Sequence, residues 1–324
     1  MVCWLDEAAV LECITPDLVI GAVEQAFRAL ARQRAINIPR ERVRLPTGVA
    51  QHILQGALLD EGVMGYKAYT SSRYGNRFAV FLFDAKTGAL GAILEANALG
   101  QWRTGAASAV ATRALAASEP SVIGLLGAGW QAAGQVRLLH HMYPNAEFRV
   151  FSRKMEACAV WCEAQQKELR AAITVVESAE AAFSEADVCI TATTSVTPVF
   201  QADWIKAGGH INAVGANALN RCEVPEALMR KAVCVVDQRE TAQRECGDLL
   251  ALVEKGHRNW SLLTELGEVL EGLRPARTEA DQVTVFESQG LGILDIAVAH
   301  AVCEVARAKG LGGQPPNHFL EGSM

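Results

Sequence analysis

An apolar strand that runs into the pattern Gly-x-Gly-x-x-Ala is the feature that most limits how this 324-residue chain can fold. The run Val122–Leu126 leads to Gly127, Gly129 and Ala132, and an amphipathic helix follows. Gly127 can form the tight turn, Gly129 lets a pyrophosphate approach the backbone, and Ala132 allows the helix to pack closely on the strand. The helix N-terminus then directs amide donors and positive dipole at the phosphates. The pattern therefore predicts a dinucleotide site at the start of a βαβ unit.

Strand-like and helical segments alternate after Pro120. Such alternation is typical of a parallel sheet with helices on both faces, so we expect an α/β fold with a Rossmann-type doubly wound sheet. The expected strands cover residues 122–126, 148–151, 173–176, 188–191, 210–214, 233–236 and 283–286.

The first part of the chain has a different pattern, with short strand-like runs from Arg40 to Glu95. We expect a helix starting at Thr15-Pro16-Asp17, strands over 63–69, 78–83 and 90–94, and a helix over 97–117. The last long helix, 291–309, follows the parallel sheet and can return to the first domain. The pattern thus separates a first domain from the Rossmann-type domain that follows Pro120.

Composition excludes several classes of partner. The net charge of −6 and the lack of a lysine or arginine run argue against nucleic acid and anionic membrane as partners. Nine cysteines without a Cys-x-x-Cys pair, several in apolar runs, are most simply read as buried reduced thiols. The first residues lack the basic start and apolar stretch of a signal peptide. We expect a cytoplasmic protein without a metal.

The second expected strand ends at Phe151-Ser152-Arg153-Lys154, where NAD-preferring sites often carry an acid that binds the ribose hydroxyls. A hydroxyl and two cations stand here instead, and they can hold a 2′-phosphate. The cofactor expected is thus NAD(P)(H), with NADP(H) favoured. The alternative interpretation is a solvated charged turn that leaves NAD(H) acceptable.

Motifs along nearly the whole chain resemble the ornithine cyclodeaminase/mu-crystallin family. Each motif is weak alone, but their order is specific. They are Gly65-Tyr66-Lys67, Phe81-Leu82-Phe83-Asp84-x-x-Thr87-Gly88, Arg103 to Ser108, the Gly127 loop with Gln131, His210 to Ala216, Gly247-Asp248-Leu249, Glu265 to Val269 and Phe286 to Gly290. The resemblance implies a smaller α+β substrate-binding and dimerisation domain, 1–117 together with 291–324, and a Rossmann dinucleotide-binding domain, 118–290, with the active site in the cleft between them. It also implies homodimers in which sheets of two subunits pack together.

The resemblance also implies a substrate that carries a carboxylate next to an imine, amine or carbonyl carbon. Lys67 and Arg103 match family positions that bind this carboxylate. A third position falls within Arg40-Glu41-Arg42-Val43-Arg44, and Arg42 is favoured. Guanidinium groups can grip a carboxylate at two points, and a lysine flanked by apolar strand residues is suited to proton transfer. Without the resemblance, these residues would be read as surface cations.

One position departs from the cyclodeaminases of the family, in which an aspartate follows Asn-Ala-Val-Gly. Asn217 stands there, and an amide cannot act as a general base at neutral pH, although it can orient a substrate nitrogen. Asn217 as a simple turn residue is the alternative.

The function expected is NAD(P)H-dependent reduction of an imino acid to an L-amino acid, or the reverse dehydrogenation. The alternatives are an ornithine-type cyclodeaminase with recycled NAD and a mu-crystallin-like binder of a small ligand. The expected catalytic residues are Lys67, Arg103, Arg42 and Asn217. The expected cofactor-binding residues are Thr104, Gly127, Gly129, Trp130, Gln131, Ser152, Arg153, Lys154, Thr191, Ala192, Thr193, Val214, Gly215, Ala216, Arg221 and Ser288.

Overall fold

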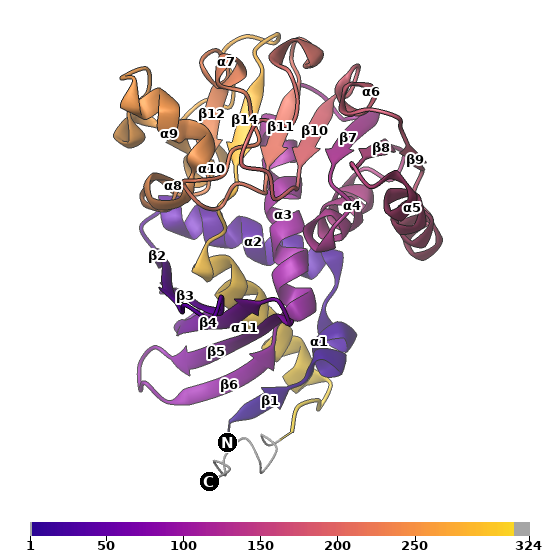
Figure 1. Cartoon of the computed structure of the whole chain (residues 1–324). Coiled ribbons are helices and arrows are strands. Elements are labelled where there is room, and N and C mark those ends of the chain that lie inside the picture. Colours follow the sequence, from indigo (N-terminus) through magenta and orange to yellow (C-terminus); the bar gives the residue numbers. More distant parts are fainter. Residues whose placement is uncertain (1, 314–324) are drawn as a thin grey trace. The chain divides into compact units, whose positions relative to one another are not determined.

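The computed structural model describes residues 2–313, and these form two compact units. One unit contains the chain up to Arg103 and from Leu291 onward, and the other runs from Thr104 to Gly290. Figure 1 shows a mixed sheet with helix α11 in the first unit and a parallel sheet in the second. Among the described residues, no helix combines the length and the apolar character needed to cross a bilayer.

The first unit contains a six-stranded sheet with the order β1-β6-β5-β4-β3-β2. Strands β2 to β6 are antiparallel neighbours, and β1 pairs with β6 in parallel. The hairpin predicted around Asp84–Gly88 joins β5 to β6. The strands are β1 (Cys3–Leu5), β2 (Ala35–Arg44), β3 (Ala50–Leu58), β4 (Val63–Ser72), β5 (Gly75–Asp84) and β6 (Leu90–Glu95).

Three helices belong wholly to this unit: α1 (Glu7–Cys13), α2 (Pro16–Ala31) and α11 (Gly292–Ala308). Helix α2 begins where predicted, because Thr15 Oγ1 accepts a hydrogen bond from the Leu18 amide at 3.3 Å. Helix α11 lies so close to β3 that a Cβ on Gly292 would stand 2.8 Å from the Gln55 nitrogen. This close approach sets the first turn of α11 directly on the sheet.

The second unit contains an eight-stranded parallel sheet with the order β13-β12-β14-β11-β10-β7-β8-β9. From β9 to β11 the strands follow the 3-2-1-4-5 order of dinucleotide-binding folds. The short edge strand β13 was not expected. The strands are β7 (Val122–Leu126), β8 (Glu147–Phe151), β9 (Ile173–Val175), β10 (Val188–Thr191), β11 (His210–Ala213), β12 (Val233–Val236), β13 (Thr264–Glu265) and β14 (Thr284–Glu287).

Helices cover both faces of this sheet (Figure 1), and fully buried residues such as Phe148, Phe183 and Phe286 fill the layers between. The helices are α4 (Trp130–Met142), α5 (Met155–Leu169), α6 (Ala179–Phe183), α7 (Glu226–Met229), α8 (Arg239–Glu245), α9 (Gly247–Glu254) and α10 (Leu266–Leu270).

Helix α3 (Asn97–Leu115) is shared by the two units, whose boundary falls between Arg103 and Thr104. The sequence placed this whole helix in the first domain, which ended at residue 117, and that placement differs from the units observed. The reason is that the second half of α3 bonds to the parallel sheet. Asn212 Nδ2 donates to Thr112 Oγ1 at 2.9 Å, and Thr284 Oγ1 donates to the Leu115 carbonyl at 3.1 Å.

Candidate functional site

The loop between β7 and α4 has the form that a dinucleotide requires. Gly127 has a φ of +111°, and a Cβ there would lie 2.5 Å from the Ala192 carbonyl oxygen, so only glycine fits. Gly129 is the N-cap of α4, offers no side-chain cap, and has no atom within 4 Å of where a Cβ would stand. The N-terminus of α4 thus lies beside open space, and a helix favours an anion at this end.

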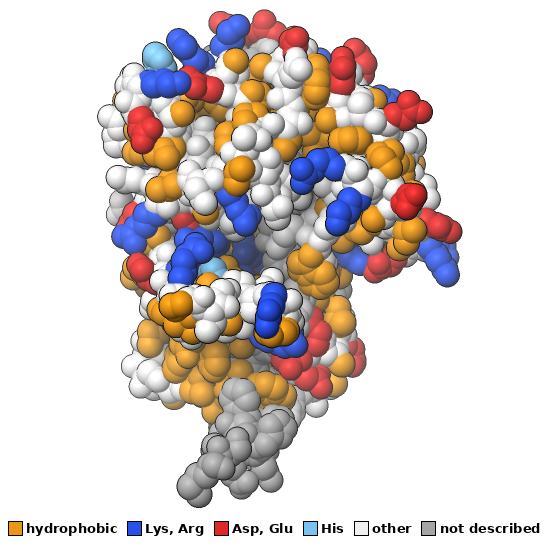
Figure 2. All heavy atoms as spheres, in the orientation of Figure 1, with side chains coloured by type: hydrophobic (Ala, Val, Ile, Leu, Met, Phe, Trp, Pro, Cys, Tyr) orange, Lys and Arg blue, Asp and Glu red, His pale blue; other side chains and the backbone are white. Residues whose placement is uncertain are grey.

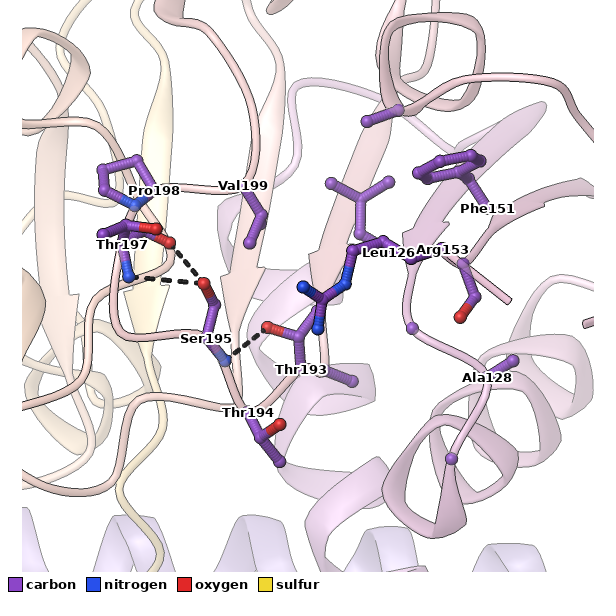
Figure 3. Close-up of a pocket in the computed structure, with 15 residues that line it drawn as sticks. Leu126, Ala128, Phe151, Arg153, Thr193, Thr194, Ser195, Thr197, Pro198 and Val199 are labelled. Carbon is purple, nitrogen blue, oxygen red and sulfur yellow. Dashed lines mark hydrogen bonds between the residues drawn. The ribbon is translucent and has the colours of Figure 1, made fainter. Parts of the chain in front are cut away.

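A cavity of about 580 Å³ opens at this loop. Six predicted cofactor residues line it: Gly127, Gly129, Ser152, Arg153, Ala192 and Thr193. Its other wall continues through Thr194 and Ser195, where the Ser195 amide donates to Thr193 Oγ1 at 3.1 Å. Figure 3 shows the Arg153 side chain extending from the β8 side towards this Thr193–Ser195 loop. A helix N-terminus, a glycine turn and a cation at the rim fit a dinucleotide.

The other residues predicted to bind cofactor do not line this cavity. Trp130 and Gln131 form the first turn of α4, and Lys154 is the N-cap of α5. Thr104 is buried in α3, and the Arg221 amide donates to the Ala218 carbonyl. The rest stand at or just after the ends of β10, β11 and β14, namely Thr191, Val214, Gly215, Ala216 and Ser288.

Glu223 joins two of these strand ends, and no motif in the sequence pointed to it. The side chain is fully buried and accepts hydrogen bonds from the Thr193 amide at 2.7 Å, the Gly215 amide at 2.7 Å and Thr191 Oγ1 at 3.0 Å. Burial raises the pKa of this carboxyl, and its hydrogen bonds to Thr193 act in the opposite direction. Asp248 in turn accepts from the Glu223 amide at 2.6 Å. Two buried carboxylates therefore fix the loops that follow β10 and β11.

A second cluster lies in the first unit, where Lys67 and Arg103 share one carboxylate. Lys67 Nζ donates to Asp295 Oδ1 at 2.8 Å, and Arg103 Nε donates to the same oxygen at 3.1 Å. Lys67 is 3% exposed and Asp295 is 0% exposed. The sequence predicted the two cations together but missed Asp295. The available signal was an acid inside the apolar run of α11, because a buried acid requires a partner.

Lys67 is buried beside two aromatic rings. Its ammonium lies 5.7 Å from the ring centroids of both Tyr69 and Phe78. Burial lowers the pKa of Lys67 to about 7, and the Asp295 carboxylate opposes that shift. A lysine in this range can both give and take a proton near neutral pH, as the sequence predicted for a buried strand lysine.

Strand β2 carries arginines near this cluster, and a β-bulge interrupts the strand at this point. The register shifts between Ile38 and Glu41, after which Arg42 pairs with His52. Arg40, at the bulge, is buried, and its charge acts on the pKa of both Lys67 and His52. Burial lowers the pKa of His52 to about 4, with Arg40, Arg42 and Arg44 adding to the effect. Arg40 thus joins Arg42, the residue favoured from sequence, as a candidate for the carboxylate.

Asn217, the fourth predicted catalytic residue, belongs to the second unit and forms an isolated bridge with Cys246. Its amide donates to the Gly215 carbonyl at 3.1 Å. The residue therefore stands in the same loop as the glycine that Glu223 holds.

Comparison with known proteins places these features in a family. A model described as the ornithine cyclodeaminase/mu-crystallin family matches residues 5–310. Ketimine reductase mu-crystallin of Mus musculus is 32% identical over 87% of this chain and 85% of its own. The structure of Thermococcus litoralis Δ1-pyrroline-2-carboxylate reductase with NADH and L-proline has a TM-score of 0.91 at 29% identity, covering 97% of this chain and 100% of that one. An archaeal alanine dehydrogenase dimer with bound NAD has a TM-score of 0.89 at 29% identity, covering 96% of this chain and 98% of that one.

Proposed function

Because this chain belongs to the ornithine cyclodeaminase/mu-crystallin family, we propose that it is an oxidoreductase that reduces a carboxylate-bearing imine to an amino acid with a nicotinamide cofactor, or catalyses the reverse dehydrogenation. The observation that carries the proposal is the buried group of Lys67, Arg103 and Asp295 in a chain that also has a dinucleotide cavity. Named relatives act on ketimines and on Δ1-pyrroline-2-carboxylate.

The roles of the residues follow from their charges. Arg103, with Arg40 or Arg42, binds the substrate carboxylate. A bound reduced nicotinamide supplies the hydride. Lys67 gives a proton to the substrate nitrogen as the C=N bond is reduced and takes it back in the reverse reaction. Asn217 orients the nitrogen through hydrogen bonds.

The first test is absorbance at the reduced-nicotinamide band, with NADH and NADPH assayed separately. The panel comprises 2-oxo acids with ammonia or methylamine, and preformed cyclic imines. Oxidation of the cofactor with one class establishes imine reduction and identifies the substrate class. Ammonia release from a diamino acid without net change in absorbance would instead indicate a cyclodeaminase, and tight binding without turnover would indicate a ligand binder.

For the cofactor we propose NADP(H). Ser152 and Arg153 stand at the rim of the cavity where the second strand ends, and Lys154 follows them. A guanidinium and a hydroxyl suit a 2′-phosphate. The two solved structures named above contain NADH or NAD, so both forms require measurement.

Replacing Arg153 by serine should lower kcat/KM for NADPH by about 10- to 100-fold, because a charge-assisted bond is worth about 1.5–3 kcal/mol. The same variant should change kcat/KM for NADH little. Lys167→Ser, an exposed lysine on α5, is the matched control. Equal losses with both cofactors would show that Arg153 does not read the 2′-phosphate.

We also propose that the protein is a homodimer formed through the outer face of the six-stranded sheet. Ile36, Ile38 and Met64 stand on this face with 51%, 42% and 37% of their surface exposed, and with Tyr66 they line a shallow groove. Figure 2 shows hydrophobic side chains gathered where Figure 1 places β5 and β6. An exposed apolar face of this kind marks an interface, and one relative is described as a dimer.

Light scattering on the purified protein should give twice the 34.8 kDa mass of one chain. Ile38→Glu, which puts a charge on the apolar face, should give the single-chain mass. Leu11→Glu changes an equally exposed leucine on α1 and should leave the dimer intact. If Ile38→Glu remains dimeric, the interface lies elsewhere.

A further inference from the structure

Asp295 has no role in the proposed reaction so far, and it occupies a costly position. It lies in the first turn of α11 with no exposed surface. The positive end of the helix dipole and two cations offset the cost of burying this charge. Two cations therefore meet at this one buried side chain.

Both cations bond to the same carboxylate oxygen. Oδ1 accepts from Lys67 Nζ and Arg103 Nε, whereas the buried Oδ2 has no hydrogen-bond partner within the described part of the chain. An ion pair that served stability alone would use both oxygens, because an unsatisfied buried acceptor costs about 1–3 kcal/mol. The arrangement brings an ammonium and a guanidinium to one point instead.

Burial and two neighbouring arginines act against the positive charge of Lys67. Burial is the largest influence, and Arg103 and Arg40 add like charge. Among the charged and titratable groups of residues 2–313 that face it, Asp295 is the only anion, and its charge favours the ammonium form, as the rings of Tyr69 and Phe78 also do. These groups are Asp295 of α11, Arg103 of α3, Arg40 of β2, His52 of β3 and Tyr69 of β4.

We propose that Asp295 is a positioning residue of the reaction, which keeps Lys67 in its ammonium form and holds the Arg103 guanidinium in place for the substrate carboxylate. The proposal rests on the proposed function, since it assigns the proton of Lys67 to the substrate nitrogen. Without the Asp295 charge, Lys67 would lose its proton at lower pH, and reduction would lack a donor at neutral pH.

The test is the pH profile of Asp295→Asn in both directions of the reaction. Reduction needs protonated Lys67, so its rate falls as pH rises through the pKa of that lysine. In Asp295→Asn, this limb of the pH–rate profile should lie lower by at least about one pH unit. Oxidation needs neutral Lys67, and its acid limb should move down with it. Asp295→Glu restores the charge and should return both limbs towards those of the wild type, with a lower rate. Asp60→Asn, in the exposed ion pair with Arg34, is the control and should leave both limbs unchanged.

A structural role predicts a different outcome, in which Asp295→Asn lowers the rate or the melting temperature but leaves both limbs in place; that result would overturn the proposal. If Asp295→Asn does not fold, Asp295→Ser, which leaves room for a water molecule, is measured in its place. Titration of ¹³C-labelled lysine by NMR, with Lys67 assigned through Lys67→Arg, reads the same shift without turnover. A wild-type protein inactive on every imine would refute the proposed function, whereas the NMR titration still decides whether Asp295 controls Lys67.

Discussion

Replacing Lys67 by methionine should reduce the rate of imine reduction by about 10²- to 10⁴-fold, the range that positioned proton transfer contributes. Methionine has nearly the length of lysine but no proton to give. Asp295 keeps its bond to Arg103 in this variant, so the buried carboxylate retains a cation. Turnover with NADH and NADPH at saturating imine is the measurement.

The wild-type enzyme should show the matching pH dependence. Since the pKa of Lys67 is lowered to about 7, the proton donor is present below that pH and lost above it. Reduction should therefore weaken as pH rises through about 7, and oxidation of the amino acid should weaken as pH falls through it. Lys67→Met should lose both limbs.

Two controls separate catalysis from folding. Lys86→Met changes an exposed lysine in the β5–β6 turn and should retain full activity. Lys67→Arg retains the charge but cannot release its proton, and should be as inactive as Lys67→Met. A folded Lys67→Met variant with normal turnover would remove Lys67 from the mechanism.

The parts of the fold that depend on neighbours in sequence could be predicted. The strand, glycine turn and helix around Gly127 are local, and Thr15 caps α2 through a residue three positions away. Lys67 and Arg103 were selected because local motifs carry them. Edge strand β13, only two residues long, lacks the length that a hydrophobic pattern needs to be seen.

The partners of these residues could not be predicted, because they come from distant parts of the chain. Lys67 and Asp295 are 228 positions apart, and only the return of α11 onto the sheet joins them. The choice between Arg40 and Arg42 depends on a β-bulge, which changes the face on which each side chain lies. Glu223 is found only once the ends of β10 and β11 are seen together.

Gly215→Ala should weaken binding of the reduced cofactor by at least about 100-fold and lower the melting temperature. A Cβ at this position would overlap the Thr193 carbonyl oxygen and lie 2.5 Å from both carboxylate oxygens of Glu223. These atoms cannot move apart without breaking the bonds from the Thr193 and Gly215 amides to Glu223. Loss of two charge-assisted bonds, each worth about 1.5–3 kcal/mol, displaces the Thr193 wall of the cavity. Fluorescence titration with NADH and NADPH measures the loss.

Three further variants, two at glycines and one at Glu223, serve as comparisons for this prediction. Gly21→Ala, with open space in α2, should change neither binding nor stability adversely, because a helical alanine is preferred to glycine. Gly129→Ala also meets no atom of the chain, so it should keep the melting temperature and lose only affinity, as the added methyl occupies room for the phosphates. Glu223→Gln should resemble Gly215→Ala in kind, since an amide NH₂ facing backbone N–H groups cannot accept their bonds. Wild-type affinity in Gly215→Ala would mean that the loops after β10 and β11 do not shape the cofactor site, and Glu223 would then serve folding alone.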